Sequence, residues 1–169
     1  GPQKGAKEKD IPILEAGLKN LCDVILQKTG KNIAAVQHGG AAGGVAAGLY
    51  GLLNAQLVNG IDYFLAIAGF EKELKNATLV ITGEGSIDMQ TLHGKAPFGV
   101  AKMAKQFSIP VIGLAGNIQG KADKELNYYF DKLICINEPG VQLEIALKNT
   151  YANLERIAYK IGETMLKDQ

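Results

Sequence analysis

The residues best suited to chemistry lie in one short stretch, Thr82 to Pro97, which reads TGEGSIDMQTLHGKAP. It holds two carboxylates, Glu84 and Asp88, and a lysine, Lys95. Carboxylates can bind Mg²⁺ or accept a proton from a hydroxyl group, and a lysine can neutralise a phosphate. Each residue alone is better explained by structure, with Asp88 capping a turn and the other two facing solvent. All three in one stretch favour a catalytic and metal-binding site for phosphoryl transfer, and both roles for Asp88, metal ligand and base, stay open.

Two glycines, Gly83 and Gly85, follow an apolar run, and Ser86 comes next. Because glycine has no side chain, a ligand can come close to its backbone. Backbone N–H groups between a strand and a helix are a common anion-binding arrangement. We therefore predict that a loop over residues 83–86 binds phosphate through its backbone, although this pattern has low specificity when it is taken alone.

The two common nucleotide-binding fingerprints are absent. A dinucleotide-binding turn needs a third glycine three residues after Gly85, where this chain has Asp88. A Rossmann-type oxidoreductase therefore loses its main support. A Walker loop needs Ser or Thr after Gly94-Lys95, where this chain has Ala96. The stretch therefore predicts an anion site of another kind.

Several further residues are candidate contacts for a substrate or nucleotide. They are Gln90, Thr91 and His93 in the same stretch, Gly39 and Gly40 in the run GGAAGG, and Asn117 after a later strand. A single histidine at a helix start is more often a structural hydrogen-bonding group than a base. The run GGAAGG is equally well explained as a second anion loop or as a small face for close helix packing.

From Thr78 onward the sequence alternates between short apolar runs and amphipathic segments. We predict strands at 79–82, 111–115 and 133–136, helices at 96–107 and near 123–129, and a long last helix that begins near Pro139. Such βαβαβα alternation indicates a parallel sheet with right-handed crossovers. Ligands of such sheets bind at the carboxyl ends of the strands, which is where the chemical stretch begins.

The preceding part of the chain has a less regular pattern. An amphipathic helix is predicted over 11–29, a strand at 33–36, and helices at 45–53 and 61–68, the last followed by a short charged piece at 71–75. The composition changes near Asn76-Ala77. We therefore predict an α/β fold that divides into residues 1–77 and residues 78–169.

The composition excludes some classes of function. Hydrophobic residues make up 47% of the chain, and 18 basic against 17 acidic residues leave a net charge of +1, which does not suit a nucleic-acid partner. Cys22 and Cys135 both lie in apolar patterns, as buried free cysteines in a reducing cytoplasm do. The least polar stretch, 41–58, contains Tyr50, Asn54 and Gln56, which argues against a membrane span.

Four segments together carry a resemblance to a known family. They are TGEGSIDMQTLHGKAP at 82–97, GPQKGA at 1–6, GGAAGG at 39–44 and PVIGLAGN at 110–117. In these segments the chain resembles the bacterial glycerate kinase family of the glycerate 2-kinase type. The resemblance implies a cytoplasmic enzyme that uses ATP and Mg²⁺ to phosphorylate D-glycerate. It also implies a Rossmann-like domain with a second α/β domain inserted, of which residues 78–169 would be the C-terminal half and residues 1–77 part of the insert.

The chain departs from the family in length. Family members are roughly twice as long and begin with an Asp-Ser-Phe-Lys-type loop, which this sequence lacks. We therefore expect a C-terminal portion that holds one wall of an active site, is inactive or weak alone, and pairs with the missing N-terminal segment or with itself. The alternative is a non-catalytic α/β module that binds phosphate or nucleotide.

Overall fold

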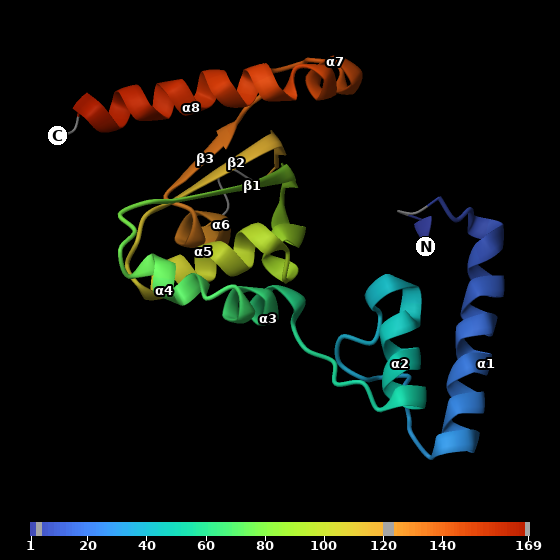
Figure 1. Cartoon of the computed structure of the whole chain (residues 1–169). Helices are drawn as coiled ribbons and strands as arrows, with labels where there is room; N and C mark the ends of the chain where they lie inside the picture. Colours follow the sequence, from blue (N-terminus) through green and yellow to red (C-terminus); the bar gives the residue numbers. More distant parts are fainter. Residues whose placement is uncertain (3–4, 120–123, 168–169) are drawn as a thin grey trace. The chain divides into compact units, whose positions relative to one another are not determined.

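The computed structural model describes residues 1–2, 5–119 and 124–167, and the chain divides into two compact units, Gly1–Asn59 and Gly60–Gln169 (Figure 1). The predicted division at residue 77 lies inside the second unit, because helix α3 (Gly60–Ile67) packs on helix α5 (Ala96–Gln106). Assignment of residues 1–77 to an inserted domain stays a prediction. None of the described helices has the length and apolar character needed to cross a bilayer.

The first unit is built on the predicted helix α1 (Ile11–Thr29), which follows the 3-10 helix η2 (Glu8–Asp10). Pro12 lies in the first turn of α1, and Gly30 ends the helix with a left-handed φ of 73°. The 3-10 helix η3 (Ala41–Gly44) then leads into the predicted helix α2 (Val45–Leu53). The two α-helices pack closely, since a Cβ on Gly51 would lie 2.6 Å from Ile25 Cγ2.

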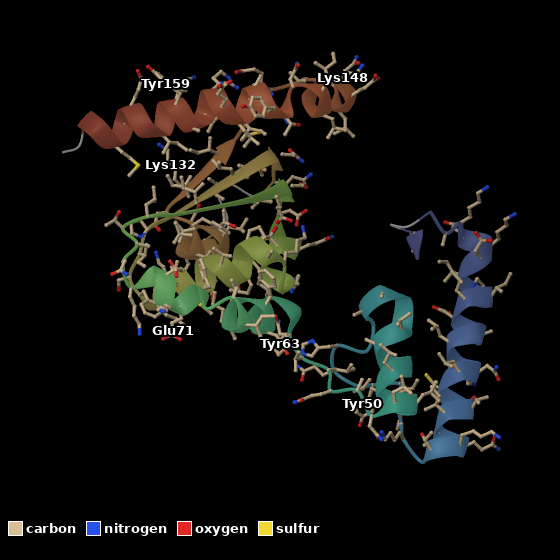
Figure 2. The ribbon with its side chains drawn as sticks, viewed as in Figure 1. Tyr50, Tyr63, Glu71, Lys132, Lys148 and Tyr159 are labelled. Atoms are coloured by element: carbon tan, nitrogen blue, oxygen red, sulfur yellow. The ribbon has the colours of Figure 1, made fainter. Side chains whose placement is uncertain are left out.

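The strand predicted at 33–36 does not form, so that prediction was wrong. The Asn32 side chain accepts a hydrogen bond from the Ala34 N–H at 3.0 Å, which favours a turn over an extended strand. Lys31 then donates to the carbonyl of Tyr50 at 3.2 Å and to the side chain of Asn54, at the end of α2 (Tyr50 is labelled in Figure 2). A cation at this position complements the partial negative charge of the helix end.

The second unit has the predicted parallel sheet, in the order β1 (Val80–Ile87), β2 (Val111–Ile118), β3 (Lys132–Cys135). Helix α8 (Thr150–Lys167) covers one face, and α5 and α6 (Lys124–Tyr129) lie on the other (Figure 1). The core on the α5 side contains Val111, Ala115 and Phe130, and the core on the α8 side contains Ile136, Ile157 and Ile161. The α/β class with a parallel sheet is thereby confirmed.

The structure corrects the first strand. It was predicted to end at Thr82, yet β1 continues through Gly83, Glu84 and Gly85 to Ile87 and pairs with β2 along this length. The register joins Glu84 to Ala115 and Ile87 to Ile118. The predicted phosphate loop at 83–86 is therefore a strand, because pairing with β2 overrides the weak strand propensity of glycine.

The last helix is also corrected, since it is two helices rather than one. Helix α7 (Leu143–Lys148) ends at Asn149, and α8 begins at Thr150, whose hydroxyl donates to the carbonyl oxygens of Ala146 at 3.1 Å and Leu147 at 3.0 Å. Figure 2 shows Lys148 and Tyr159 on the side of these helices that faces away from the sheet. Earlier in the chain, the charged piece at 71–75 overlaps helix α4 (Phe70–Leu74), which was not predicted from the sequence.

Close packing of α3 on α5 requires Gly99. A Cβ at this position would lie 2.8 Å from Ile61 Cγ2 and would also overlap Ile61 Cγ1. We expect Gly99→Ala to lower the free energy of unfolding by about 1–3 kcal/mol, because overpacking outweighs the better helix propensity of alanine. The matched control is Gly162→Ala in α8, where no atom lies within 4 Å and where we expect a gain of about 0.5–1 kcal/mol. Urea denaturation measures both, and equal stability of the two variants would contradict this account.

Asp131 joins the start of β2 to α5. Its carboxylate accepts a hydrogen bond from the Val111 N–H at 2.8 Å and one from Lys105 Nζ at 3.2 Å. Burial raises the pKa of Asp131, but these two partners outweigh it, so the pKa lies below the usual 3.8. The folded state therefore favours the charged form.

This lowered pKa makes the stability depend on pH. The contribution of Asp131 is present above pH 3.8 and is lost as the pH falls through the lower folded-state pKa. We expect Asp131→Asn to be less stable than the wild type at neutral pH, with the difference shrinking on acidification. Urea denaturation across this range tests it, with Asp23→Asn as an exposed control. A difference that stays constant with pH would show that the carboxylate charge is not involved.

Candidate active site

The structure brings together the three residues that the sequence singled out for chemistry. Lys95 Nζ lies 3.4 Å from Glu84 Oε2 and 3.8 Å from Asp88 Oδ1, and it donates to the Ser86 carbonyl at 3.5 Å. Glu84 lies in β1, Asp88 directly follows β1, and Lys95 immediately precedes α5. The Lys95 side chain keeps 36% of its surface exposed, so its ammonium remains accessible to a ligand.

Local structure fixes how the chain returns to this site. Asp88 caps the 3-10 helix η4 (Met89–His93) by accepting a hydrogen bond from the Gln90 N–H at 2.8 Å. Gly94 ends η4 with a left-handed φ of 92°, and Pro97 lies in the first turn of α5. Asp88 therefore does cap a turn, as its structural explanation predicted. The same carboxylate also contacts Lys95, so the two roles exist together.

Thr91 has a different role from the predicted ligand contact. Its side chain is 0% exposed, and its hydroxyl donates to Glu84 Oε1 at 2.6 Å while accepting from the Asp88 N–H at 3.2 Å. No surface of this residue is left for a ligand. Thr91 instead holds one oxygen of Glu84, so that the other oxygen faces Lys95.

The remaining predicted contacts are dispersed. Gln90 is exposed and lines a small cavity of about 250 Å³ with Asp88, and His93 is exposed at the end of η4. Gly39 and Gly40 lie in the first unit, where Gly39 is buried and Gly40 is exposed. A ligand contact by these two glycines therefore stays a prediction.

The two carboxylates of the cluster differ in how well they suit Mg²⁺. Both oxygens of Glu84 have partners, Thr91 and Lys95, whereas the Gln90 hydrogen bond and the Lys95 ion pair of Asp88 share one oxygen, Oδ1. Mg²⁺ in phosphate-handling enzymes needs only one or two carboxylates, because phosphate oxygens and water complete its shell. Asp88 fits such a role, and Glu84 does not in this arrangement. The described part of the chain has no group of three or more acidic, His or Cys side chains that could hold a metal alone.

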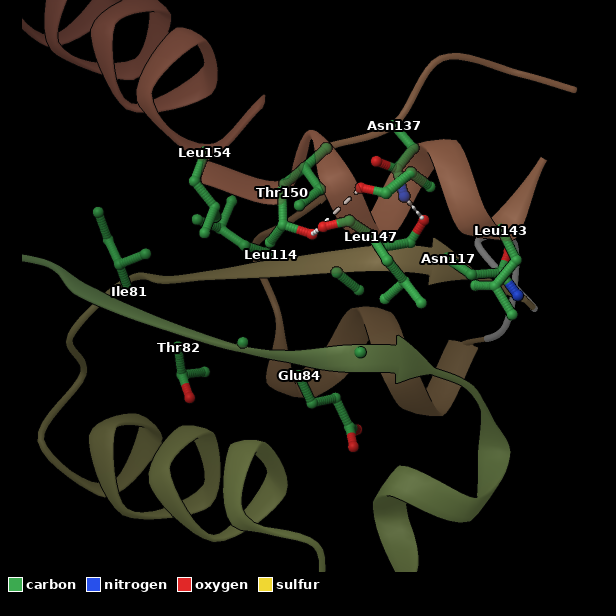
Figure 3. A pocket seen from close by; sticks show the side chains of 16 residues that line it. Ile81, Thr82, Glu84, Leu114, Asn117, Asn137, Leu143, Leu147, Thr150 and Leu154 are labelled. Atoms are coloured by element: carbon green, nitrogen blue, oxygen red, sulfur yellow. Dashed lines mark hydrogen bonds between the residues drawn. The ribbon is translucent and has the colours of Figure 1, made fainter. Parts of the chain in front are cut away.

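A larger cavity of about 540 Å³ lies on the other face of β1, against β2, α7 and α8. Figure 3 shows Thr82 and Glu84 pointing away from it, on the opposite side of β1 from Leu114 and Leu154. Its lining is mainly apolar, and two carboxamides, Asn117 and Asn137, lie at the end nearest the carboxyl ends of the strands. The cavity thus begins where ligands of parallel sheets bind.

Sequence reasoning missed Asn137. Its Nδ2 donates to the Gly116 carbonyl at 2.8 Å, and its Oδ1 accepts from Asn153 Nδ2 at 3.0 Å, so a residue of α8 holds it in place. Arg156 adds a hydrogen bond to the Ile136 carbonyl at 2.9 Å. The available signal was positional, since Asn137 follows a predicted strand as Asn117 does.

The fold and the cluster define an α/β protein with a lysine and two carboxylates at the carboxyl end of a parallel strand. The sequence model of the glycerate kinase family matches residues 1–166, and the chain belongs to this family. It is 39% identical over 165 residues to a glycerate kinase of Bacillus subtilis and 36% identical over 165 residues to a glycerate 2-kinase of Escherichia coli. Each of these two alignments covers 98% of this chain and 43% of the relative.

A solved structure agrees with this relationship. A crystal structure described as glycerate kinase 2 from Salmonella typhimurium LT2 matches all of this chain and 43% of its own, with a TM-score of 0.70 and 38% sequence identity. The chain therefore spans less than half the length of the relatives it matches, and the fold of that portion is shared.

The buried position of Thr91 leads to a test of the cluster. We expect Thr91→Val to lower the free energy of unfolding by about 1–3 kcal/mol, because it leaves a Glu84 oxygen and the Asp88 N–H without their partner. Thr91→Ser keeps the hydroxyl and isolates the cost of the lost methyl group. Thermal unfolding of both variants measures the difference. If valine were as stable as serine, the hydroxyl would not be holding Glu84.

Proposed function

We propose that this chain forms part of the active site of an ATP-dependent kinase that phosphorylates D-glycerate in the cytoplasm. The observation that carries the proposal is the position of Lys95 between Glu84 and Asp88 in a chain of the glycerate kinase family. The relatives are named glycerate kinases, so a small hydroxy acid is the expected acceptor.

Lys95 is the proposed phosphate-binding group. Phosphoryl transfer relies mainly on positioning and on neutralising charge at the phosphate oxygens, and an accessible ammonium supplies both. Glu84, held by Thr91, fixes the direction of the Lys95 side chain. The Asp88 carboxylate is the proposed group to bind Mg²⁺ or to accept the proton of the substrate hydroxyl. Mg²⁺ held by Asp88 would neutralise negative charge on the phosphate.

Gln90 and His93 are proposed as substrate or nucleotide contacts near Asp88, because both are exposed on η4. Gly83, Gly85 and Ser86 are proposed to contribute backbone surface beside the site, since both glycines line the larger cavity and the Ser86 carbonyl contacts Lys95. Gly39 and Gly40 are proposed as a separate contact supplied by the first unit.

The sheet of the second unit has an uncovered edge that further polypeptide could cover. Among the described residues β1 pairs only with β2, so its other edge is open. Ile81 is 50% exposed and Leu147 66% exposed beside this edge. An unpaired strand edge beside exposed apolar side chains favours association. We propose that the part of the longer relatives absent here, or a second copy of this chain, covers this surface and completes the active site.

The test uses a chimera in which this chain replaces the matching segment of the Bacillus subtilis relative. We expect glycerate-dependent ADP formation by the chimera and little or none by the chain alone. Lys95→Met should lower kcat/KM by roughly 100-fold or more, as the loss of a charge-stabilising group does. The matched control is Lys102→Met, at an exposed lysine within α5, which should change little.

The outcomes separate the alternatives. A folded chimera whose activity does not respond to Lys95→Met would overturn the assigned role. Binding of Mg²⁺ and nucleotide without product would favour the non-catalytic module. Asp88→Asn divides the two roles of that residue, because a lost metal ligand raises the Mg²⁺ concentration required, whereas a lost base lowers kcat at every Mg²⁺ concentration.

A further inference from the structure

A second cavity, of about 430 Å³, lies at the carboxyl ends of β2 and β3, and we call it the carboxyl-end crevice. It is lined by Gly116, Asn117, Ile118, Cys135, Asn137, Glu138, Pro139, Gly140, Val141, Leu143 and Ala146. All of these residues belong to the second unit. Its volume lies within the range of about 300–1,000 Å³ that is typical of small-molecule sites.

The walls of the crevice combine bare backbone with apolar side chains. Gly116 leaves the floor without a side chain, and a Cβ there would lie 3.0 Å from the Gly85 carbonyl oxygen and 3.4 Å from Asn137 Nδ2. Val141 and Leu143, which also line the crevice, are exposed. The crevice therefore offers a flat ring both apolar side chains and bare backbone to contact.

The two carboxamides of the crevice differ in how they are held. Asn137 is fixed by Gly116 and Asn153. Asn117 is exposed, and no described residue hydrogen-bonds to its side chain (Figure 3). One carboxamide thus shapes the crevice, and the other is free to bind a ligand.

We propose that the carboxyl-end crevice binds the adenine ring of the nucleotide and that the Asn117 carboxamide recognises its edge. This inference rests on the proposed kinase function, which requires ATP. A carboxamide offers a donor beside an acceptor, and adenine presents an amino donor beside a ring-nitrogen acceptor, so the two can form a bidentate pair. Apolar side chains combined with a small number of placed polar groups are the usual form of such sites.

The place of the crevice relative to Lys95 agrees with this assignment. Gly116 of β2 lies directly beside Gly85 of β1, and the next residue, Ser86, accepts a hydrogen bond from Lys95. Adjacent strands are about 4.8 Å apart, so the crevice and the lysine lie along the same edge of the sheet within a few strand spacings. Lys95 therefore lies within reach of the phosphates of a nucleotide whose base occupies the crevice.

The chain carries its own reporter for this test. Cys135 lines the crevice, and Cys22 lies in α1 of the other unit. We expect adenosine to slow the alkylation of Cys135 by N-ethylmaleimide in the 169-residue chain and to leave Cys22 unaffected. Peptide mass spectrometry measures the two rates. If adenosine up to its solubility limit does not protect Cys135, or protects both cysteines equally, the inference is overturned.

A variant at Asn117 tests the recognition itself. Asn117→Asp keeps the size but offers only acceptors, which suit the two ring-edge donors of guanine and lose the ring nitrogen of adenine. We expect the concentration of adenosine that half-protects Cys135 to rise by about tenfold or more, and the preference for adenosine over guanosine to fall by at least as much. Asn117→Gln should retain part of the adenosine effect.

The matched control is Asn76→Asp, which makes the same charge change at an exposed residue before the amino end of β1. If Asn76→Asp shifted the preference as strongly as Asn117→Asp, the crevice would not be the site of recognition. Adenosine carries no phosphate, so the outcome is separate from that of the kinase proposal. Protection without phosphoryl transfer in the chimera would leave the crevice assignment standing. Transfer without protection would reject only the crevice.

Discussion

The parallel pairing of β1 with β2 is the constraint on which the rest of the second unit depends. It runs from Val80 opposite Val111 to Ile87 opposite Ile118 with one constant register. Because that register carries β1 past its glycines, Asp88 emerges beside the end of β2 rather than in a separate loop. The polar residues that follow the two strands are therefore brought to one edge of the sheet, where the candidate site lies.

The position of Lys95 depends on the path that the chain takes after it leaves this edge of the sheet. The chain leaves β1 at Asp88, makes the single turn η4, and returns through Gly94, so that the start of α5 lies over Glu84. Buried Thr91 holds Glu84 against this return. Glu84 and Asp88 each combine a structural hydrogen bond with a contact to Lys95, which leaves Lys95 partly exposed but oriented.

Most of the helices could be predicted because their signals are local. Helix α1 was correct in extent because its apolar spacing, Pro12 and Gly30 all lie within it, and the start of α5 is marked by Pro97 in the same way. The length of β1 could not be predicted, since Gly83 and Gly85 resemble a loop until β2 is present to pair with them. The strand at 33–36 failed for the opposite reason, because a local turn at Asn32 took precedence where no neighbouring strand formed.

In the candidate site, too, local features could be predicted from the sequence and long-range contacts could not. The sequence identified Glu84, Asp88 and Lys95 by residue type, and their convergence agrees with the short spacing between them. It could not show that Thr91 is buried, because that depends on how η4 packs against β1. Asn137 was missed because its function in the crevice depends on Asn153, which lies on a distant helix.

The two glycines around Glu84 have an explanation that does not involve anion binding. Successive side chains of a strand point to opposite faces, so Glu84 faces α5 while residues 83 and 85 face the larger cavity. A Cβ on Gly83 would lie 2.5 Å from the Leu114 carbonyl oxygen, so this position is closed to other residues by β2. A Cβ on Gly85 would meet nothing within 4 Å and would only narrow the cavity. The order glycine-acid-glycine thus places a carboxylate on one face of the sheet and keeps the other face bare, and the strand that carries the Lys95 partner also forms a wall of the cavity that continues to Asn117.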